Sequence, residues 1–331
     1  MRPEEKGEAM TLTAATRFGA ARLLALSLSA AMLAAAPANA SLCSNTSTGL
    51  VPLVDLRTGT HQGEQGGLYP GGVNQPPALH AAIGDVMSSL VMPRDATGLP
   101  AADGRVVFMS VGMSNTFQES QHLRSGILDD ETRSENLTFV NGAQGGQAAE
   151  DMADPTAPYW SYVDEQLADA GVTPLQVQTV WLKQANRRPD QAFPADAERL
   201  QGDLREIVTI LKARYPNLML VYLSSRIYAG YASTPLNPEP HAYQSGFSVK
   251  WLIEEQIGGT LPYGLMPWLG WGPYFWADGL MPRGTDGLIW TCDDFAVDGT
   301  HPSGEGASKV GDMLLDFLQS DPTATSWYLA P

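Results

Sequence analysis

Five short runs of apolar residues recur along the chain between residues 105 and 290. They read RVVFMSV (105–111), NLTFV (136–140), VQTVWL (177–182), LMLVYL (218–223) and GLIW (287–290). Runs of this length that are apolar without alternation, and rich in β-branched and aromatic residues, are typical of strands buried on both faces of a sheet. The pattern therefore predicts five buried strands.

The segments between these runs carry the periodicity of amphipathic helices. In residues 195–217, Leu200, Leu204 and Ile207 fall on one helix face, and the apolar residues of 307–318 repeat that spacing. Apolar strands that alternate with such helices predict a parallel sheet covered on both faces. Right-handed crossovers then place the carboxyl ends of the strands at one edge, where ligands of open α/β sheets bind.

The first forty residues do not follow this pattern. Arg17 and Arg22 precede the apolar run LLALSLSAAMLAAA, and the small residues ANA end at Ala40. A positive flank, a short apolar run and a small-residue cleavage site predict a signal peptide over residues 1–40, with an apolar run too short to span a bilayer. The signal peptide predicts an exported protein, either periplasmic or extracellular. No later segment is apolar enough to span a bilayer, so we expect the mature protein to be soluble.

The rest of the chain divides by composition. Residues 41–104 are rich in Gly and Pro, with a helix expected around 77–91, and we expect them to form an N-terminal extension packed on the main domain. The main domain then covers residues 105–331. Within it, residues 225–286 form an irregular insertion rich in Pro, Gly and aromatic residues, and long segments of this kind are usually functional or disordered. The aromatic residues argue against disorder.

Charge and cysteine content narrow the function and the compartment. The chain has 36 acidic and 20 basic residues, a net charge of −16. Such a surface is expected to repel nucleic acid and anionic membranes, but not neutral substrates such as sugars or their esters. Cys43 and Cys292 are expected to form a disulfide in an oxidising compartment, with two unpaired buried thiols as the alternative.

The sequence Gly112-Met113-Ser114-Asn115 follows the first predicted strand directly. Glycine allows a sharp turn, and the serine would then lie at the start of the next helix. Free backbone N–H groups and the helix dipole favour developing negative charge there, so the position suits a nucleophile. An ordinary turn or helix cap is the alternative.

The segment DDFAVDGTH (293–301) offers the best general base for this serine among the five histidines. Asp298 precedes His301 by three residues, so a tight turn can set its carboxylate against one ring nitrogen and leave the other to take the serine proton. A capping turn with an exposed histidine is one alternative. A cation site of Asp293, Asp294, Asp298 and His301 is another, although no calcium-loop spacing fits and no second histidine is near in the sequence.

Acyl transfer also requires donors that stabilise an oxyanion. The second predicted strand is followed by NGAQGG (141–146), where the backbone N–H of Gly146, or of the adjacent Gly145, is open to close approach. The third is followed by KQAN (183–186), whose Asn186 amide is a candidate donor. Suitable groups at four separate strand ends are less expected by chance than any one of them.

This ordered set of motifs resembles the SGNH hydrolases of the GDSL esterase superfamily, and in particular the branches with Gly-x-Ser-Asn that act on carbohydrate esters. Ser114 matches the nucleophile, and its N–H, Gly146 and Asn186 match the oxyanion donors. Asp298 and His301 match the final Asp-x-x-His motif, including the Pro that often follows it.

The resemblance covers roughly residues 105–318, with two departures. Met113 replaces the usual Asp or Gln, and Gln184 replaces the usual glycine before the oxyanion asparagine. The resemblance implies a flavodoxin-like three-layer α/β/α fold with a central parallel five-stranded sheet. It also implies hydrolysis of a small-molecule or glycan ester, with no cofactor and no required metal. The oligomeric state is left open.

Aromatic residues of the insertion are candidates for substrate contact. Trp268, Trp271 and Trp276 are predicted to overhang the ligand edge and to stack on sugar rings, although such rings also form the local core of an insertion. Arg226, after the fourth predicted strand, is a candidate for contact with an anionic group, but an arginine there more often pairs with a structural carboxylate. We expect a secreted serine esterase, with a non-catalytic carbohydrate-binding or scaffold protein, or a metal-dependent hydrolase, as alternatives.

Overall fold

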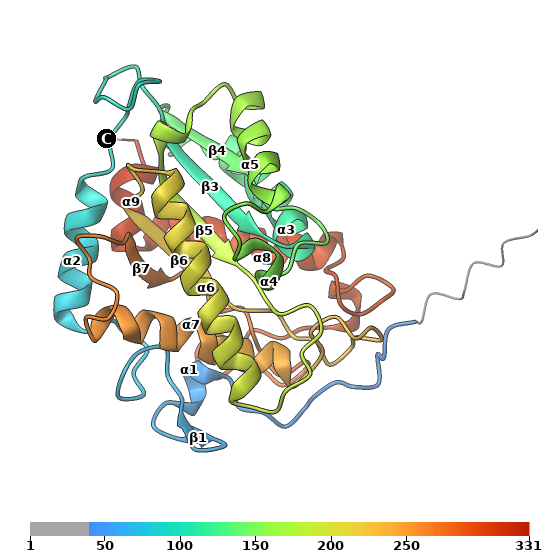
Figure 1. Ribbon diagram of the computed structural model, residues 1–331. Helices are drawn as coiled ribbons and strands as arrows, with labels where there is room; N and C mark the ends of the chain where they lie inside the picture. Colours follow the sequence, from blue (N-terminus) through green and yellow to red (C-terminus); the bar gives the residue numbers. More distant parts are fainter. Residues whose placement is uncertain (1–39, 331) are drawn as a thin grey trace, which may run out of the picture. The chain divides into compact units, whose positions relative to one another are not determined.

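The structure, a computed structural model, describes residues 40–330, and five of their strands form one parallel sheet (Figure 1). In spatial order these are β4 Leu137–Asn141, β3 Val106–Gly112, β5 Val177–Lys183, β6 Leu220–Ser224 and β7 Trp268–Trp271. Numbered along the chain, the order is 2-1-3-4-5, the arrangement of flavodoxin-like sheets. The predicted α/β fold with a central five-stranded parallel sheet is confirmed. A separate hairpin joins β1 Thr60–His61 to β2 Glu64–Gln65.

Helices cover both faces of this sheet. One layer contains, in order of contact, α3 Ser114–Asp129, α8 Gly304–Ser320, α9 Pro322–Tyr328 and α2 Ala78–Ser89. The other contains α5 Pro158–Asp169, α4 Ala149–Met152, α6 Ala195–Arg214 and α7 His241–Ile257. Three shorter elements are α1 Leu53–Leu56 and the 3₁₀ turns η1 Pro174–Gln176 and η2 Cys292–Asp294. In Figure 1, α6 lies in front of the sheet and α8 behind it, so the molecule has three α/β/α layers here.

Burial explains why the strands have no alternating pattern. Every residue of β3, β5, β6 and β7 is buried, because a helix layer covers each face. The edge strand β4 is partly exposed. The predicted face of α6 is buried at Leu200, Leu204 and Ile207. Four of the five predicted strands are therefore confirmed.

The fifth strand is not where the sequence pattern placed it. Residues 287–290 form no strand, although Trp290 is fully buried and its indole Nε1 donates to the Phe275 carbonyl at 2.8 Å. The fifth strand is β7, which lies inside the segment that was expected to be irregular, as does the 17-residue helix α7. An apolar run records burial, and burial without sheet pairing gives the same pattern.

The register of the sheet brings three strand ends level with one another. Gly112 of β3 lies beside Lys183 of β5, and Lys183 lies beside Ser224 of β6. The residues that follow these strands therefore emerge side by side at the carboxyl edge. In a 2-1-3-4-5 sheet, this edge between the first and third strands is where ligands bind.

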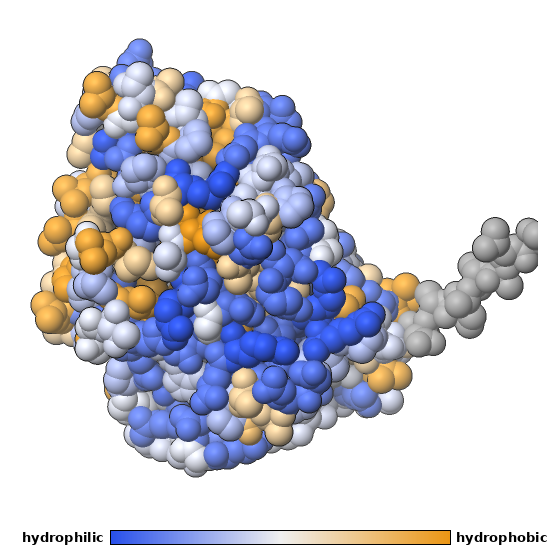
Figure 2. Space-filling view, viewed as in Figure 1, coloured by the Kyte–Doolittle hydropathy of each residue, from blue (hydrophilic) through white to orange (hydrophobic). Residues whose placement is uncertain are grey.

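Residues 40–104 contact the edge of the sheet near β7. The Trp268 indole Nε1 donates to the His80 carbonyl at 2.9 Å, and that of Trp271 donates to the Leu68 carbonyl at 2.8 Å. Figure 2 shows hydrophobic residues gathered over α2, where Leu79 and Val86 are exposed, and a more hydrophilic surface over α6. The predicted signal peptide lies outside the described residues apart from Ala40. No helix of residues 40–330 is long and apolar enough to cross a membrane.

The predicted disulfide is present between Cys43 and Cys292, which are 249 positions apart. It joins the start of the described chain to η2, directly before the segment 293–301. The bridge therefore connects the N-terminal segment to the loop that carries the candidate base.

Candidate active site

Ser114 is the first residue of α3, and only Met113 separates it from the end of β3. The chain makes this sharp turn because residue 112 is glycine: a Cβ there would collide with the Lys183 carbonyl oxygen and the Thr116 hydroxyl. The turn leaves the Ser114 side chain at the carboxyl edge of the sheet, where the first-turn N–H groups of α3 have no partner within the helix. The sequence expectation for the placement of this serine therefore agrees with the structure.

His301 is held in position by a tight turn that begins at Asp298. Gly299 has φ +63°, and a Cβ there would collide with the Tyr231 carbonyl, so both the backbone conformation and the space require glycine. The Asp298 Oδ1 accepts hydrogen bonds from the backbone N–H groups of Thr300 and His301, each at 3.0 Å. The carboxylate thus fixes the turn before it contacts the imidazole ring.

The structure brings Ser114, His301 and Asp298 into one chain of hydrogen bonds. The Ser114 Oγ lies 2.8 Å from His301 Nε2, and His301 Nδ1 lies 2.7 Å from Asp298 Oδ2. Because an ionised carboxylate only accepts, Nδ1 carries the hydrogen and Nε2 is left to accept the serine proton. This is the arrangement that a nucleophile and its base require.

Two opposing effects act on the pKa of Asp298. Burial raises it, but hydrogen bonds from the His301 ring and from the backbone N–H groups of His301 and Thr300 outweigh burial, so the pKa lies below its usual value. The carboxylate therefore stays ionised at neutral pH. In that state it stabilises the imidazolium that would form when Ser114 loses its proton.

A buried ion pair fixes α3 to the sheet near Ser114. The Lys183 Nζ of β5 lies 2.5 Å from Glu119 Oε1 of α3, and neither side chain is exposed. Desolvation lowers the pKa of Lys183 to about 8, against the attraction of Glu119. The Thr116 hydroxyl adds a bond to the Lys183 carbonyl at 2.8 Å. The first turns of α3 are thus attached to β5, which fixes the position of Ser114.

Ser114 and His301 open into a small cavity of about 80 Å³. Its walls come from the loops that follow β3, β4, β5 and β6, and from the loop of the candidate base. The lining residues are 113–115, 146–148, 185–187, Arg226, 236–237 and 300–301. The predicted oxyanion residues Gly146 and Asn186 therefore share one cavity with the predicted triad.

Gly145 and Gly146 both lie near the nucleophile. A Cβ on Gly145 would be 3.9 Å from the Ser114 Cβ, whereas Gly146 lines the cavity and has open space beside its Cα. Asn141 shapes this turn, because its Oδ1 accepts from Ser110 Oγ and its Nδ2 donates to the Phe117 carbonyl. Both glycines therefore remain candidates for the backbone donor.

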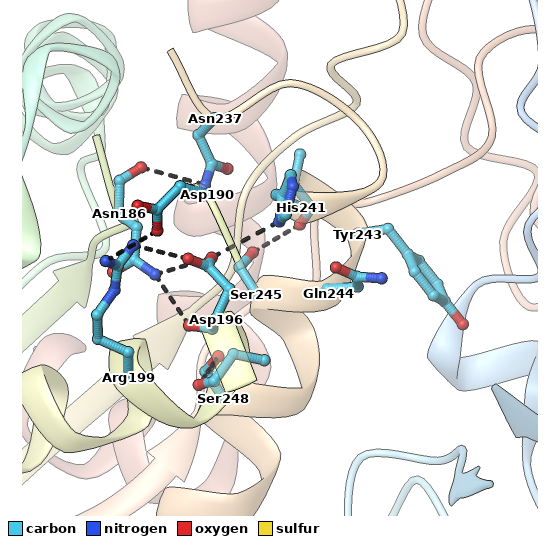
Figure 3. Close-up of polar contacts among 12 residues, drawn as sticks. Asn186, Asp190, Asp196, Arg199, Asn237, His241, Tyr243, Gln244, Ser245 and Ser248 are labelled. Carbon is cyan, nitrogen blue, oxygen red and sulfur yellow. Dashed lines mark hydrogen bonds and ion pairs between the residues drawn. The ribbon is translucent and has the colours of Figure 1, made fainter. Parts of the chain in front are cut away.

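Asn186 is engaged differently from the sequence expectation (Figure 3). Its Nδ2 donates to the Asp196 carbonyl and to Asp196 Oδ2, both at 2.9 Å, and its buried Oδ1 has no partner. Arg199 and His241 also approach the Asp196 carboxylate, at 2.7 and 3.6 Å. Since both amide hydrogens are used, Asn186 can donate to an oxyanion only if it releases Asp196.

The prediction that three tryptophans contact substrate is wrong for this cavity. Trp268, Trp271 and Trp276 are 4, 6 and 0 % exposed, and none of them lines it. The Trp276 indole donates to Glu239, while Trp268 and Trp271 border a different hollow between α2 and α9. The rings are core residues because the segment that carries them forms the last strand of the sheet and its packing.

The cation site considered for the segment 293–301 is not formed either. Among residues 40–330, no three His, Cys, Asp or Glu side chains are grouped as a metal site would require. Asp294 instead accepts from Thr291 and pairs with Lys309 at 2.6 Å. Asp294 therefore binds α8 through Lys309, whereas Asp298 is hydrogen-bonded to His301.

Two lining residues carried little or no sequence signal. Asn237 lies in the left-handed region with φ +49°, and its Nδ2 donates to the Asn186 carbonyl at 3.2 Å. Arg226 was considered for an anionic group but was expected to pair with a carboxylate. Both lie in an irregular loop after β6, and no local pattern shows which loop residues face a cavity.

Comparisons with known proteins give fold likenesses alone. No family model matches the chain, and no curated protein matches it. A GDSL-like lipase from Bacteroides thetaiotaomicron is 12% identical with a TM-score of 0.37, over 72% of this chain and 96% of that one. The periplasmic domain of a lipopolysaccharide acetyltransferase from Salmonella ser. Paratyphi A is 12% identical with a TM-score of 0.38, over 73% of this chain and 96% of that one. A protein from Arabidopsis thaliana is 15% identical with a TM-score of 0.36, over 62% of this chain and 67% of that one.

Likenesses at this level carry no argument about activity. The sheet order, the helix layers and the strand-end placement of Ser114 come from the chain itself. They are the features that the resemblance implied from the sequence. The fold is a three-layer α/β/α arrangement with a flavodoxin-like sheet order.

Proposed function

We propose that the protein is a serine hydrolase of carboxylic esters, with Ser114 as nucleophile, His301 as general base and acid, and Asp298 as the group that orients His301. The observation that carries the proposal is the unbroken hydrogen-bond chain of these three residues at the wall of a cavity. Ser114 and His301 are 187 positions apart, and packing alone does not require them to be hydrogen-bonded at a cavity wall. Acid–base catalysis does require this arrangement.

In the first half of the reaction, His301 Nε2 takes the Ser114 proton as Oγ attacks the ester carbonyl carbon. The resulting imidazolium is stabilised by the Asp298 carboxylate at 2.7 Å. The tetrahedral intermediate collapses when the carbon–oxygen bond to the alcohol breaks, and His301 returns its proton to that leaving oxygen. In the second half, water replaces the alcohol and the same transfers release the acid and restore Ser114.

The negative charge of the intermediate requires donors that are already in place. The first-turn N–H of Ser114 and a backbone N–H at Gly146 or Gly145 are the candidates with no competing role in the proposal. The Asn186 amide joins them when it gives up Asp196. The size of the cavity favours a small ester over a long acyl chain.

We infer that this activity is exported. The Cys43–Cys292 disulfide supports the inference, because such bonds persist in oxidising compartments. A glycan ester stays one substrate class within the proposal, on the Gly-x-Ser-Asn motif alone, since the buried tryptophans no longer support it.

The first prediction concerns Ser114→Ala. With p-nitrophenyl acetate as substrate, we expect kcat to fall by about 10⁴-fold or more, because the nucleophile and its base act as a unit. Ser125→Ala is the matched control, since Ser125 lies on the same helix with its hydroxyl bonded to the Gln121 carbonyl, and it should keep wild-type activity.

A fluorophosphonate probe should label the wild-type chain at Ser114 and leave Ser114→Ala unlabelled, as read by peptide mass spectrometry. Activity that survives Ser114→Ala, or that EDTA removes from the wild type, would contradict the proposal and point to a metal-dependent hydrolase. Absence of both labelling and turnover across acetyl, butyryl and glycan esters would favour a non-catalytic binding protein.

A further inference from the structure

Arg226 is a buried cation in the wall of the candidate active site. It follows β6 by two residues, is 1% exposed, and lines the same cavity as Ser114 and His301. Burial lowers the pKa of its guanidinium, and Glu119, Glu239 and Asp298 oppose that effect from a distance. A guanidinium keeps its charge under such conditions, so the cavity has a permanent positive group in its wall.

The hydrogen-bonding capacity of this guanidinium is largely unused. Its Nη2 lies 3.5 Å from the Thr300 carbonyl, at the outer limit of a hydrogen bond, and its buried Nε has no partner. No ion pair found among residues 40–330 includes Arg226. A buried charge without a direct counterion is unfavourable unless something else neutralises it.

Arg283 shows how this chain satisfies a buried arginine whose role is structural. It is 5% exposed, and its Nε and Nη2 donate to the two carboxylate oxygens of Asp286 at 2.9 and 2.5 Å. Its Nη1 donates to the Tyr274 and Trp276 carbonyls. Arg226 has neither the carboxylate nor a comparable set of carbonyls.

The carboxylates nearest to Arg226 are committed elsewhere. Glu119 pairs with Lys183, and Asp298 binds His301. Glu239 accepts from the Trp276 indole and from two backbone N–H groups. These charges keep Arg226 protonated, but none is a direct partner for it.

The charged groups that line the cavity all have one sign. They are Arg226, Arg187 and, when protonated, His301, with no Asp or Glu among the lining residues. Arg187 is paired at the rim with Asp151, so Arg226 is the unpaired one. In a chain of net charge −16, a cavity without acidic residues is a local reversal that favours an anionic ligand.

We propose that the substrate of this site is an ester that carries a carboxylate close to the scissile bond, and that Arg226 binds this carboxylate. A carboxylate suits a guanidinium, because the charge-assisted hydrogen bonds between the two groups are stronger than neutral ones. The carboxylate must be close to the scissile bond because Arg226 contacts the carbonyl of Thr300, the residue before His301. The choice of an ester rests on the proposed function, whereas the anion site itself does not.

Binding is tested first, in the unreactive Ser114→Ala chain by calorimetry. Two pairs of matched esters serve as probes: 4-acetoxybenzoate with 4-acetoxybenzamide, and acetoxyacetate with acetoxyacetamide. We expect the anionic member of at least one pair to bind at least 10-fold more tightly, and Arg226→Gln to remove that difference. Arg187→Gln, at the exposed rim, should reduce it by less than about threefold. No preference for the anion in either pair overturns the proposal.

Turnover gives the second readout. The ratio of kcat/KM for the anionic ester to that for the neutral ester should fall by about 10- to 100-fold in Arg226→Gln, as expected for a charged hydrogen bond. Arg226→Lys should restore part of the ratio. An equal loss for both esters would mean that Arg226 only supports the Thr300 loop, and would overturn the proposal. If Arg226→Gln does not fold, the proposal is tested on the wild type: its preference for the anionic ester over the neutral one should be present and should decrease at high salt.

The two proposals fail in different ways. Tight binding of the anionic ester by Ser114→Ala, without turnover by the wild type, would uphold the anion site and reject ester hydrolysis. Turnover of both esters at equal rates, without a binding preference, would uphold hydrolysis and reject the anion site.

Discussion

At the residue scale, the site depends on two glycines as much as on its reacting groups. Gly112 lets α3 begin close against β5, and Gly299 lets the turn of the candidate base pass against Tyr231. Each allows a backbone approach that a side chain would prevent. The backbone thus brings the two segments close enough for Ser114 Oγ and His301 Nε2 to lie 2.8 Å apart.

Asp298→Asn tests the role of the carboxylate. An amide at this position can present its NH₂ group to the ring, which favours the tautomer with the hydrogen on Nε2, and that tautomer cannot accept the serine proton. We expect kcat to fall by about 10³- to 10⁴-fold with KM little changed. Asp293→Asn is the matched control, because Asp293 is exposed in the same segment. A loss below tenfold would mean that Asp298 only fixes the turn.

Asn186→Ala separates an oxyanion donor from a structural amide. If Asn186 leaves Asp196 during the reaction, kcat should fall by about 10²- to 10³-fold, with a smaller effect on KM. If it only links Asp196 to the loop, the variant should lose thermal stability and keep its kcat. Steady-state kinetics and a thermal melt on the same sample distinguish the two roles.

At this scale, the sequence pattern pointed to three residues that the structure brings together, but not to the residues around them. Ser114, Asp298 and His301 could be predicted because a strand end or a fixed spacing marks each of them. The burial of Trp268 and the unpaired state of Arg226 could not, because both depend on how residues 225–286 fold. That segment has no periodicity from which to predict contacts.

At the element scale, four strands were predictable because each is a short apolar run, fully buried in β3, β5 and β6 and partly buried in the edge strand β4. The fifth prediction failed because residues 287–290 and 268–271 are both apolar and aromatic, and only β7 pairs with β6. In the first run only Trp290 is buried, whereas every residue of β7 is. Pairing is a long-range property that composition does not record. The short helices α1, α4 and α9 are likewise too brief for a period to be visible.

Asp130 links the end of α3 to two other helices. Its Oδ2 accepts from the Tyr328 hydroxyl of α9 at 2.6 Å and from Gln319 of α8 at 2.8 Å, and its Oδ1 accepts from Thr132. Burial raises the pKa of Asp130, but these hydrogen bonds outweigh it and hold the pKa at about 2. The ionised form is thus favoured in the folded chain.

Asp130→Asn should therefore change stability only above the acid range. Because the folded-state pKa is lowered, the contribution of the carboxylate is complete above pH about 4 and is lost as the pH falls towards 2. At pH 6 the variant should be less stable by under about 1 kcal/mol, since the residue is only partly buried and solvent screens its interactions. Thermal melts from pH 2 to 7 test this, with the exposed Asp129→Asn as control. A difference that persists unchanged at pH 2 would contradict the assignment.

At the scale of the whole molecule, the N-terminal segment and the candidate active site are joined through a single covalent link. Cys292 lies six residues before Asp298, in the 3₁₀ turn that leads to the segment 293–301, and Cys43 lies near the start of the described chain. Leu42 adds a backbone hydrogen bond to Tyr231, the residue that Gly299 passes. These two contacts therefore connect the N-terminal segment to the loop that carries His301.

The double variant Cys43→Ser, Cys292→Ser tests this link. We expect the free energy of unfolding to fall by about 2–5 kcal/mol, because the bridge closes a very long loop. Each kcal/mol corresponds to about 2–4 °C in Tm. Calorimetry with and without a reductant on the wild type gives the same comparison without substitution. An unchanged Tm would show that the N-terminal segment is held by its other contacts alone.

The disulfide also has a consequence for how the chain matures. Its cysteines are the only two in the sequence, so a single intramolecular pairing exists and oxidation cannot scramble it. The second thiol is made 249 residues after the first, so closure comes only when most of the polypeptide has been synthesised. Maturation then needs an oxidant but no disulfide isomerase. A chain that ends before Cys292 lacks both the second thiol and His301, the proposed proton acceptor, so Cys43 stays reduced in it.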